Sequence, residues 1–562
     1  MFRPIAFFLV SFLVVAWGQP DHGFFLSFSA SGIGFACCFR ALLCIKGTKG
    51  RFLWAGVWFA AVQGVQLFWM TGSEYQGYVR FFAYGGCVLF QGLQFASIFG
   101  LLSEKCIRKP YLLNFLAISG VWTLAEWGRL FVLCGFVWNP LGLTMTGSLL
   151  AAQSASVVGM FGLSFWVIMT NLFGLRMLAL GTPRLRTVFP FLLVWLLPFA
   201  FGGMHVAYHT SRMKEETKRY RIALVQTALS PPVKATLSPY RQWEKIFAYL
   251  EGEVEGPVTH IILPECALPG SANRFCYPYE DVCAVLRNFK GMPDSTRLLI
   301  PSFAKYFPER EGGGWCVNNL FWSQVLADAY GAEVVVGLTD VEERGEVAYN
   351  AAFHLMPGGE SACRYEKRIL LPVAEYMPFP LLRSLASSFG ISGFFMHGKE
   401  TKVFDGEPPL TVSICYEDCF GHVIREGRKK GAELLVNVTN DGWYPSSGLH
   451  LKHFLHGKIR AIENGAPFVR ACNTGVTSGM DALGRVTALF EGEDSETVRG
   501  TLVVSVNPYT YHTVYTYSGN GLIVTLSALC VTVALFRLAS NRLRIYHADR
   551  LARGSASSRD PV

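Results

Sequence analysis

Three residues that together can transfer an acyl group follow short β-like runs in the second half of the chain. Glu265 ends the run HIILPE, Lys367 lies in YEKRILLP, and Cys415 ends LTVSIC. A carboxylate close to a thiol can accept its proton, and a lysine can stabilise both the thiolate and the oxyanion formed when sulfur attacks a carbonyl. Such a set performs acyl transfer through a thioester on cysteine. Taken singly, each residue type is more often structural in a domain of this kind.

The residues around Cys415 favour a nucleophile over a structural thiol. In PLTVSICYEDC the cysteine ends an apolar, β-branched run and is followed by a tyrosine and two acids. Only the thiolate attacks, and the charges and hydrogen bonds around the sulfur set its reactivity, whereas a structural cysteine needs no such neighbours. Cys419 is either a small buried apolar group, which we favour, or a thiol that captures Cys415 on oxidation.

The elements that must position these residues form an α/β pattern between residues 208 and 512. Short β-rich runs such as RIALVQ, EVVVGL, LLVNV and TLVVSV alternate with polar helical stretches at 239–255 and 451–464. This alternation is typical of a layered α/β domain, in which active-site groups gather at strand ends. The segment is long enough to bury a core of its own.

The rest of the chain is too apolar for an ordinary soluble protein. Of the 562 residues, 51% are hydrophobic and 16% are charged, which indicates membrane segments. Eight apolar stretches, most of them near the roughly 20 residues that a helix needs to cross a bilayer, cover residues 4–18, 24–43, 52–70, 81–102, 111–135, 149–172, 188–204 and 521–538. We therefore expect a transmembrane bundle of seven plus one helices. The expected divisions are an N-terminal bundle at 1–207, the α/β domain at 208–512, a C-terminal transmembrane helix at 513–540 and a basic cytoplasmic tail at 541–562.

Positive charge in the loops predicts how the bundle is oriented. The loops after the second, fourth and sixth stretches are basic, through Lys46, Lys49, Arg51, Lys105, Arg108, Lys109, Arg176, Arg184 and Arg186. The positive-inside rule places these loops in the cytoplasm and the α/β domain outside it. The net charge of +9 follows this topology and gives no basic stripe for nucleic acid. The first stretch could instead be a cleaved signal peptide, although VVAWGQP lacks an A-x-A-like site.

Two further groups of polar residues have ordinary interpretations. Glu126 and Arg129, three residues apart in the fifth stretch, can pair on one helical face, either to hold the bundle together or to admit substrate. The histidines of HLKHFLH are only roughly on one face and have no acidic or cysteine partner in the pattern, so we expect a polar helix face and no metal. The apolar, glycine-bearing segment 384–395 is either a mobile arm that dips toward lipid or part of the domain core.

Longer strings resemble the apolipoprotein N-acyltransferases, which are membrane-embedded members of the nitrilase, or carbon-nitrogen hydrolase, superfamily. ILPECALPG, YEKRILLPVAEYMPF, SICYED, NVTNDGWY and AIENGAPFVRACNTGVTSGMDALGRV occur in the order of that family, and AEWGRLFVLCGFVWNPLG in the apolar half is also similar. The resemblance covers nearly the whole chain. It implies a seven-plus-one helical bundle with an inserted nitrilase-like αββα sandwich on the periplasmic side of a bacterial inner membrane.

The same resemblance implies the site residues. The catalytic residues would be Glu265, Lys367 and Cys415, without metal or other cofactor, and the supporting or substrate-binding residues would be Glu375, Tyr416, Glu417 and Trp243. Three features depart from the family pattern. Glu366 stands where a histidine is common, Ala374 replaces the usual glycine, and an insertion around 290–331 lengthens the interval between Glu265 and Lys367.

The activity implied is the last step of bacterial lipoprotein maturation. A fatty acyl chain would pass from a membrane phospholipid to Cys415, and then to the α-amino group of the S-diacylglyceryl cysteine that begins an apolipoprotein. The partners would be these two lipids and the bilayer, with no nucleic acid; the sequence leaves the oligomeric state open, with a monomer as the default. Two alternatives remain: a membrane-anchored amidase or nitrilase acting on a small carbon-nitrogen substrate, and a transporter or receptor whose domain only binds ligand.

Overall fold

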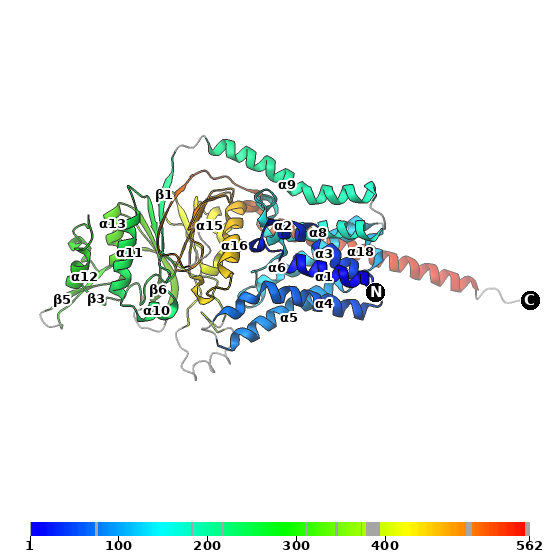
Figure 1. The fold of residues 1–562 in the computed structure, drawn as a ribbon, viewed down its shortest axis with the longest axis horizontal. Coiled ribbons are helices and arrows are strands. Elements are labelled where there is room, and N and C mark those ends of the chain that lie inside the picture. Colours follow the sequence, from blue (N-terminus) through cyan, green and yellow to red (C-terminus); the bar gives the residue numbers. More distant parts are fainter. Residues whose placement is uncertain are drawn as a thin grey trace, which may run out of the picture.

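The structure is a computed structural model that describes residues 2–73, 77–108, 110–180, 184–214, 218–309, 313–342, 347–372, 374–377, 394–490 and 497–556. Figure 1 shows a helical bundle in blue and cyan beside an α/β domain in green to orange. The segment 384–395, expected as an arm or a core segment, lies almost wholly outside the described residues.

A helix occupies each of the eight apolar stretches. The second stretch is α2 (Phe24–Ser29), the π-helical turn η2 (Ala30–Gly34) and α3 (Phe35–Leu43). The other stretches form α1 (Phe2–Ala16), α4 (Thr48–Gln66), α5 (Val79–Phe99), α6 (Tyr111–Gly128), α8 (Ala155–Ala179), α9 (Leu185–Met213) and α18 (Gly521–Ala556), with the short α7 (Leu149–Ala152) before α8. Within the described part of the chain, five helical segments are long and apolar enough to cross a membrane: Phe24–Leu43, Val79–Phe99, Ala155–Ala179, Leu185–Met213 and Gly521–His547.

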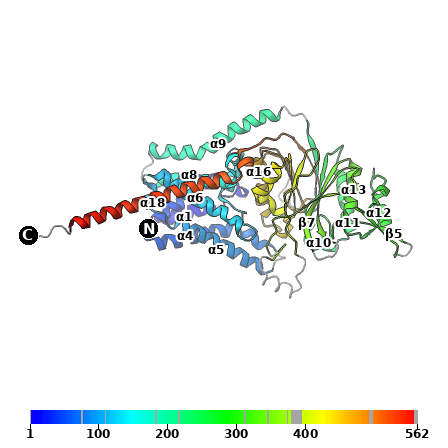
Figure 2. The same cartoon turned by 180° about the vertical axis from the view of Figure 1, so that it is seen from behind.

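The bundle is packed around α8, most of whose apolar span is buried, and around an aromatic core. Rings of Phe59 and Phe95 stack with centroids 4.4 Å apart, and Phe39 and Phe99 stack at 4.7 Å. Figure 2 shows α18 running along α6. The two helices approach so closely that a Cβ on Gly120 would lie 2.8 Å from the carbonyl oxygen of Ser527, so this contact requires glycine.

The expected ion pair between Glu126 and Arg129 is wrong. Arg129 instead donates to the side-chain oxygens of Gln94 and Gln91 on α5, at 2.7 and 2.9 Å, while Glu126 accepts the backbone N–H of Leu141 at 2.9 Å. Both residues are buried. They therefore fix α6 to its neighbour and to the loop that follows it, which is a structural role.

The α/β domain contains two large sheets and one small one. The six-stranded sheet has the order β14-β1-β2-β6-β7-β8, the five-stranded sheet β13-β12-β11-β10-β9, and the small sheet β3-β5-β4. The strands are β1 (Tyr220–Gln226), β2 (His260–Ile262), β3 (Tyr277–Pro278), β4 (Ala304–Phe307), β5 (Gly314–Val317), β6 (Glu333–Val341), β7 (Ala348–Leu355), β8 (Cys363–Glu366), β9 (Leu410–Ile414), β10 (Leu434–Thr439), β11 (Phe468–Cys472), β12 (Ser478–Met480), β13 (Val486–Leu489) and β14 (Gly500–Val506). β1, β2 and β6 are parallel, as are β9, β10 and β11.

The two large sheets pack face to face, and helices cover their outer faces. Ile222 and Val335 from one sheet share a core with Val412 and Val436 from the other. The outer helices are α11 (Pro239–Glu253), α12 (Tyr279–Leu286) and α13 (Asn319–Tyr330) on the side of the six-stranded sheet, and α15 (Gly421–Lys429) and α16 (Leu449–Asn464) on the side of the five-stranded sheet. The short α10 (Pro231–Thr236) buries none of its residues. Strands covered on both faces are largely apolar. The predicted αββα sandwich is confirmed.

The domain is joined to the bundle through α16. Leu455, Ile459 and Ile462 belong to the same buried cluster as the membrane helices. One residue on, Glu463 accepts the backbone N–H of Met160 at 2.8 Å, where α8 is interrupted by Gly159 with φ +66°. The carboxylate therefore satisfies a donor that the broken helix leaves without an intrahelical partner.

Candidate active site

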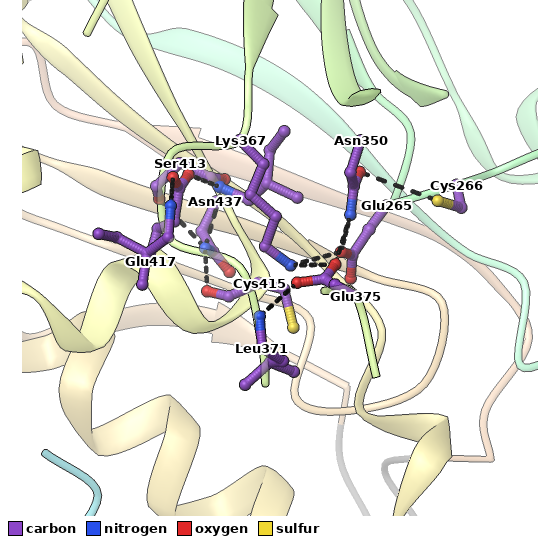
Figure 3. Close-up of polar contacts among 12 residues, drawn as sticks. Glu265, Cys266, Asn350, Lys367, Leu371, Glu375, Ser413, Cys415, Glu417 and Asn437 are labelled. Carbon is purple, nitrogen blue, oxygen red and sulfur yellow. Dashed lines mark hydrogen bonds and ion pairs between the residues drawn. The ribbon is translucent and has the colours of Figure 1, made fainter. Parts of the chain in front are cut away.

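The three predicted strand ends meet where the two sheets face each other. Lys367 follows β8, Cys415 follows β9, and Glu265 lies three residues after β2. Lys367 Nζ lies 3.1 Å from Glu265 Oε1, and Figure 3 shows the Cys415 side chain beside this pair. All three side chains are buried. Because the strands belong to different sheets, the site depends on the packing of the whole sandwich.

Lys367 is held between two carboxylates. Its ammonium lies 2.8 Å from Glu375 Oε1 as well as 3.1 Å from Glu265. Burial opposes the positive charge, but the two carboxylates outweigh burial, so the pKa of Lys367 is raised well above its ordinary value. The lysine is therefore a fixed cation at neutral pH and can donate hydrogen bonds to a developing negative charge.

Asn350 on β7 is a site residue that the sequence reasoning missed. Its amide donates to Glu265 Oε1 at 2.7 Å and to Glu375 Oε1 at 3.0 Å, so it bridges the two acids around Lys367 (Figure 3). The signal was an asparagine inside the apolar strand AYNAAFHL. A buried polar side chain in such a run requires a partner.

Cys415 sits in a strained turn. Its φ is +51°, a region that residues other than glycine rarely adopt and that clusters at functional sites. Asn437 donates to the Cys415 carbonyl oxygen at 3.1 Å and holds the turn. Burial raises the pKa of the Cys415 thiol well above its ordinary value; Glu265 raises it further, and Lys367 opposes the rise. The resting sulfur is a protonated thiol, so attack requires a nearby proton acceptor.

Glu417 connects the turn that contains Cys415 to the segment that follows Lys367. Its carboxylate accepts the backbone N–H groups of Ile414 at 2.8 Å, Arg368 at 2.6 Å and Ile369 at 3.1 Å. Tyr365 donates its hydroxyl to the same group at 2.9 Å. Burial raises the pKa of Glu417, and the backbone donors oppose this. The residue thus fixes the positions of Cys415 and Lys367 relative to each other without pointing at the sulfur (Figure 3).

Tyr416 connects the turn of Cys415 to the membrane bundle. Its hydroxyl donates to the Gly135 carbonyl at 3.1 Å and accepts the Val137 N–H at 3.3 Å. Its ring stacks on Trp138 with centroids 4.7 Å apart. All three partners lie in the segment between η5 (Arg129–Phe131) and η6 (Leu141–Gly147). The segment that follows α6 is therefore a wall of the site, and Trp138 is a second residue to which the sequence reasoning gave no role.

Trp243 does not join this group in the described contacts. It lies on α11, fully buried, stacked on Trp322 at 5.6 Å and donating to Asn319 at 3.2 Å. Trp243 and Trp322 belong to the core between the outer helices and the six-stranded sheet. A role for Trp243 in substrate binding stays a prediction, and its contacts favour a structural one.

A second charged group lies behind Cys415, and we call Asp418, Asp441, His453 and Arg470 the buried quartet. His453 is 2.8 Å from Asp418 and 2.7 Å from Asp441, while Arg470 is 2.6 and 3.2 Å from the same two acids. The expectation that no acid or cysteine accompanies the histidines is wrong, because Asp418 and Cys419 place donor atoms within 4.8 Å of one another and of His453. Arg470 already neutralises Asp418, so the set does not resemble an open metal site.

The cysteines are all free thiols. The structure describes each of the fifteen, and no disulfide joins any two. Burial raises the pKa of Cys419 well above its ordinary value, with Asp418 adding to the effect. This is the environment of an inert buried thiol, as favoured from the sequence.

Comparison with known proteins agrees with this geometry. The carbon-nitrogen hydrolase family model matches residues 221–512, so the sandwich is a domain of the carbon-nitrogen hydrolase class. Solved structures matched over this part include an amidase from Nesterenkonia sp., 18% identical, covering 54% of this chain and 94% of that chain with a TM-score of 0.34.

The membrane part identifies the family more closely. The model of the apolipoprotein N-acyltransferase N-terminal domain matches residues 6–173. Curated relatives named apolipoprotein N-acyltransferase include one from Chlamydia caviae, 31% identical over 94% of this chain and 97% of that protein. Another, from Chlamydia pneumoniae, is 29% identical over 93% and 96%. The chain belongs to the apolipoprotein N-acyltransferase family.

Proposed function

We propose that the chain moves a fatty acyl chain from a membrane phospholipid to the N-terminal S-diacylglyceryl cysteine of an apolipoprotein, through a thioester on Cys415. The observation that carries this proposal is the lysine clamped by two carboxylates, 3.1 and 2.8 Å away, beside a protonated thiol in a turn that contacts the membrane bundle. Acyl transfer requires a base, an oxyanion donor and a nucleophile, and these three groups provide them.

The first half-reaction acylates the enzyme. Glu265 takes the thiol proton of Cys415, and the thiolate attacks the ester carbonyl of the phospholipid. Lys367 donates to the tetrahedral oxyanion, which collapses with loss of the carbon–oxygen bond. Glu265 returns the proton to the leaving alkoxide, so a lysophospholipid departs and an acyl thioester remains. The thioester stores the acyl group while donor and acceptor exchange.

The second half-reaction acylates the acceptor. The free α-amine of the diacylglyceryl cysteine attacks the thioester carbonyl, a carbon–nitrogen bond forms, and the carbon–sulfur bond breaks. Glu265 removes the amine proton and passes it to the Cys415 sulfur as this leaves. Neither half-reaction needs a redox partner. The cycle ends with Cys415 protonated, as it began.

The supporting residues have positioning roles in this proposal. Glu375 holds Lys367 next to Glu265 and also accepts the Leu371 N–H at 2.8 Å. Glu417 fixes the spacing between Lys367 and Cys415, and Tyr416 fixes the nucleophile turn against the bundle. None of these three has to exchange a proton with substrate.

We also propose the topology and its boundaries. The eight helices cross the inner membrane as seven plus one, and the domain from 208 to 512 faces the periplasm between the bundle at 1–207 and the helix at 513–540. The tail at 541–562 returns to the cytoplasm. A helix at each apolar stretch and the basic loops on one side support this arrangement. A monomer is sufficient for the reaction, since one chain supplies every group named.

Acyl labelling tests the function. Full-length protein in lipid nanodiscs is incubated with phospholipid carrying a radiolabelled acyl chain, without acceptor. We expect a hydroxylamine-sensitive label on Cys415 that is transferred when a diacylglyceryl lipopeptide is added. Cys415→Ala should abolish the label, whereas the matched variant Cys419→Ala should retain it. A wild-type chain that took no label and hydrolysed small amides would instead favour the amidase alternative.

A further inference from the structure

A cavity of about 480 Å³ lies between the membrane bundle, the nucleophile turn and the start of α18. One wall is apolar and comes mainly from the end of α6 and η5, with Trp127 and Phe131, and from Phe420. The opposite wall is polar and includes His422 and Arg425 on α15 and Asn520. The cavity is therefore amphipathic, as a site for a lipid with a polar head must be.

The inner end of this cavity is built by residues next to the reacting groups. Phe420 packs edge-on against Tyr416 with centroids 4.9 Å apart. Ile369, which also lines the cavity, lies two residues after Lys367 and donates its N–H to Glu417. A molecule held here would thus touch the segments that carry both the nucleophile and the lysine.

The polar wall has the charge that an anion requires. Among the described residues that line the cavity, Arg425 carries the one permanent charge, and there is no carboxylate. Its Nε and Nη2 donate to carbonyl oxygens of α17 (Val514–Ser518), which leaves Nη1 available. His422 is exposed beside it. Ser518, Gly519 and Gly521 complete this side with little bulk.

The cavity also lies at the ends of two apolar helices, α6 and α18. The apolar span of α18 begins at Gly521, which lines the cavity, and α6 ends at Gly128, next to the lining residue Trp127. The ends of apolar spans mark the boundary between hydrocarbon and headgroups. An arginine at that boundary faces the phosphate layer of the leaflet.

We propose that this cavity holds the phosphodiester of the donor phospholipid, with Arg425 and His422 contacting phosphate oxygens and the acyl chains lying against the apolar wall. This inference rests on the proposed function and specifies which substrate the cavity accepts. The occupant is the donor, because the diacylglyceryl cysteine of the acceptor has no phosphate. The site would bind any glycerophospholipid through its shared phosphate and hold the ester near Cys415.

The test compares two donors with the same acyl chains, phosphatidic acid and diacylglycerol, which differ only in the phosphate. Single-turnover acylation of Cys415 is measured with a phospholipid and with the diacylglycerol of the same acyl chains, in mixed micelles. We expect the wild-type chain to prefer the phospholipid by about 10-fold or more, since a charge-assisted hydrogen bond is worth a factor of that order. His422→Gln and Arg425→Gln should each slow acylation from the phospholipid and leave the diacylglycerol rate unchanged.

Lys430→Gln is the matched control, because Lys430 is a partly exposed cation just beyond the end of α15, paired with Glu426, and it does not line the cavity. It should behave as the wild type. Arg425 also holds α17, so His422→Gln provides the variant that leaves those bonds intact. Equal losses with both donors, or no loss with either, would overturn the phosphate site. A wild-type chain acylated by neither lipid would overturn the proposed function and this inference with it.

Discussion

Two buried groups of charges lie close to Cys415, and they differ in balance and in access. The acid–lysine cluster, Glu265, Lys367 and Glu375, sets two carboxylates against one ammonium. The buried quartet sets two carboxylates against two cations, since the two acids raise the pKa of His453 to about 9 against the effects of burial and Arg470. The acid–lysine cluster therefore has one carboxylate without its own cation, whereas every carboxylate of the buried quartet is neutralised.

The two clusters also differ in how far their side chains are exposed. Side chains of Glu265 and Glu375 are 7% and 12% exposed. In the buried quartet, Asp441 is 3% exposed and the other three side chains are 0% exposed. A carboxylate without its own cation, in a position that substrate can reach, can act as a base. A closed neutral set can only support the fold. Proximity to a nucleophile therefore does not identify the catalytic groups, whereas charge balance and access together do.

Replacing one acid by its amide should have different effects in the two clusters. The largest effect on the acylation rate is expected in the acid–lysine cluster. Glu265→Gln removes the proton acceptor and keeps the shape, so acylation of Cys415 should fall by about 10²–10⁴-fold. Single-turnover labelling measures this. The unfolding midpoint should stay close to that of the wild type, and a variant that was fully active would show that another group is the base.

Asp418→Asn is the counterpart in the buried quartet. It leaves Arg470 and His453 with one carboxylate between them, so the free energy of unfolding should fall by about 3–5 kcal/mol. Denaturant unfolding in detergent measures the loss. The rate per folded molecule should stay within a few-fold of wild type, and a loss of rate at unchanged stability would give the quartet a direct catalytic role.

Glu375→Gln tests whether the two acids of the acid–lysine cluster have different roles. The variant removes one charged partner of Lys367 but leaves Glu265 in place, so the acylation rate should fall by about 10–100-fold, as for loss of a hydrogen bond to a charged group. The same labelling assay is used, with Glu265→Gln in parallel. An effect as large as that of Glu265→Gln would mean that the two acids share the role of base.

The pH dependence of stability should give the smallest effect. His453 has an ordinary pKa of 6.5 and a folded pKa of about 9, so its charged contacts stabilise the fold fully below pH 6.5. This contribution is lost as the pH rises through about 9. The unfolding midpoint of the wild type should therefore decrease between pH 6.5 and 9 more steeply than that of His453→Gln. Parallel curves would contradict a protonated His453.

Much of the site could be predicted because the reacting residues follow strands that are readable one at a time. Glu265 and Lys367, 102 residues apart, meet because both β2 and β8 end at the same region of the sandwich. The partners that were missed come from segments without a chemical signature. Tyr416 and Gly135 are 281 residues apart and belong to different bodies, so only the docking of bundle on domain reveals their contact.

The assignments that failed or weakened also have physical reasons. Trp243 stands after the first strand, but α11 is amphipathic and buries Trp243, Ile246, Phe247 and Leu250 on one face, which turns the indole to the core. Glu126 and Arg129 are correctly spaced for pairing, yet glutamines on α5 and the Leu141 N–H are in better positions. Helical spacing shows which side chains can meet and does not show which competing partner is closer.

The contact of α16 with the broken helix α8 means that the catalytic domain cannot be separated cleanly from its anchor. An excised sandwich would present Leu455, Ile459 and Ile462 to water and would leave Glu463 without the backbone donor of Met160. Solubility would then require rebuilding that face with polar residues, in the way that a subunit is redesigned when its partner is removed. The α/β domain packs against the membrane bundle as one subunit packs against another, although both belong to one chain.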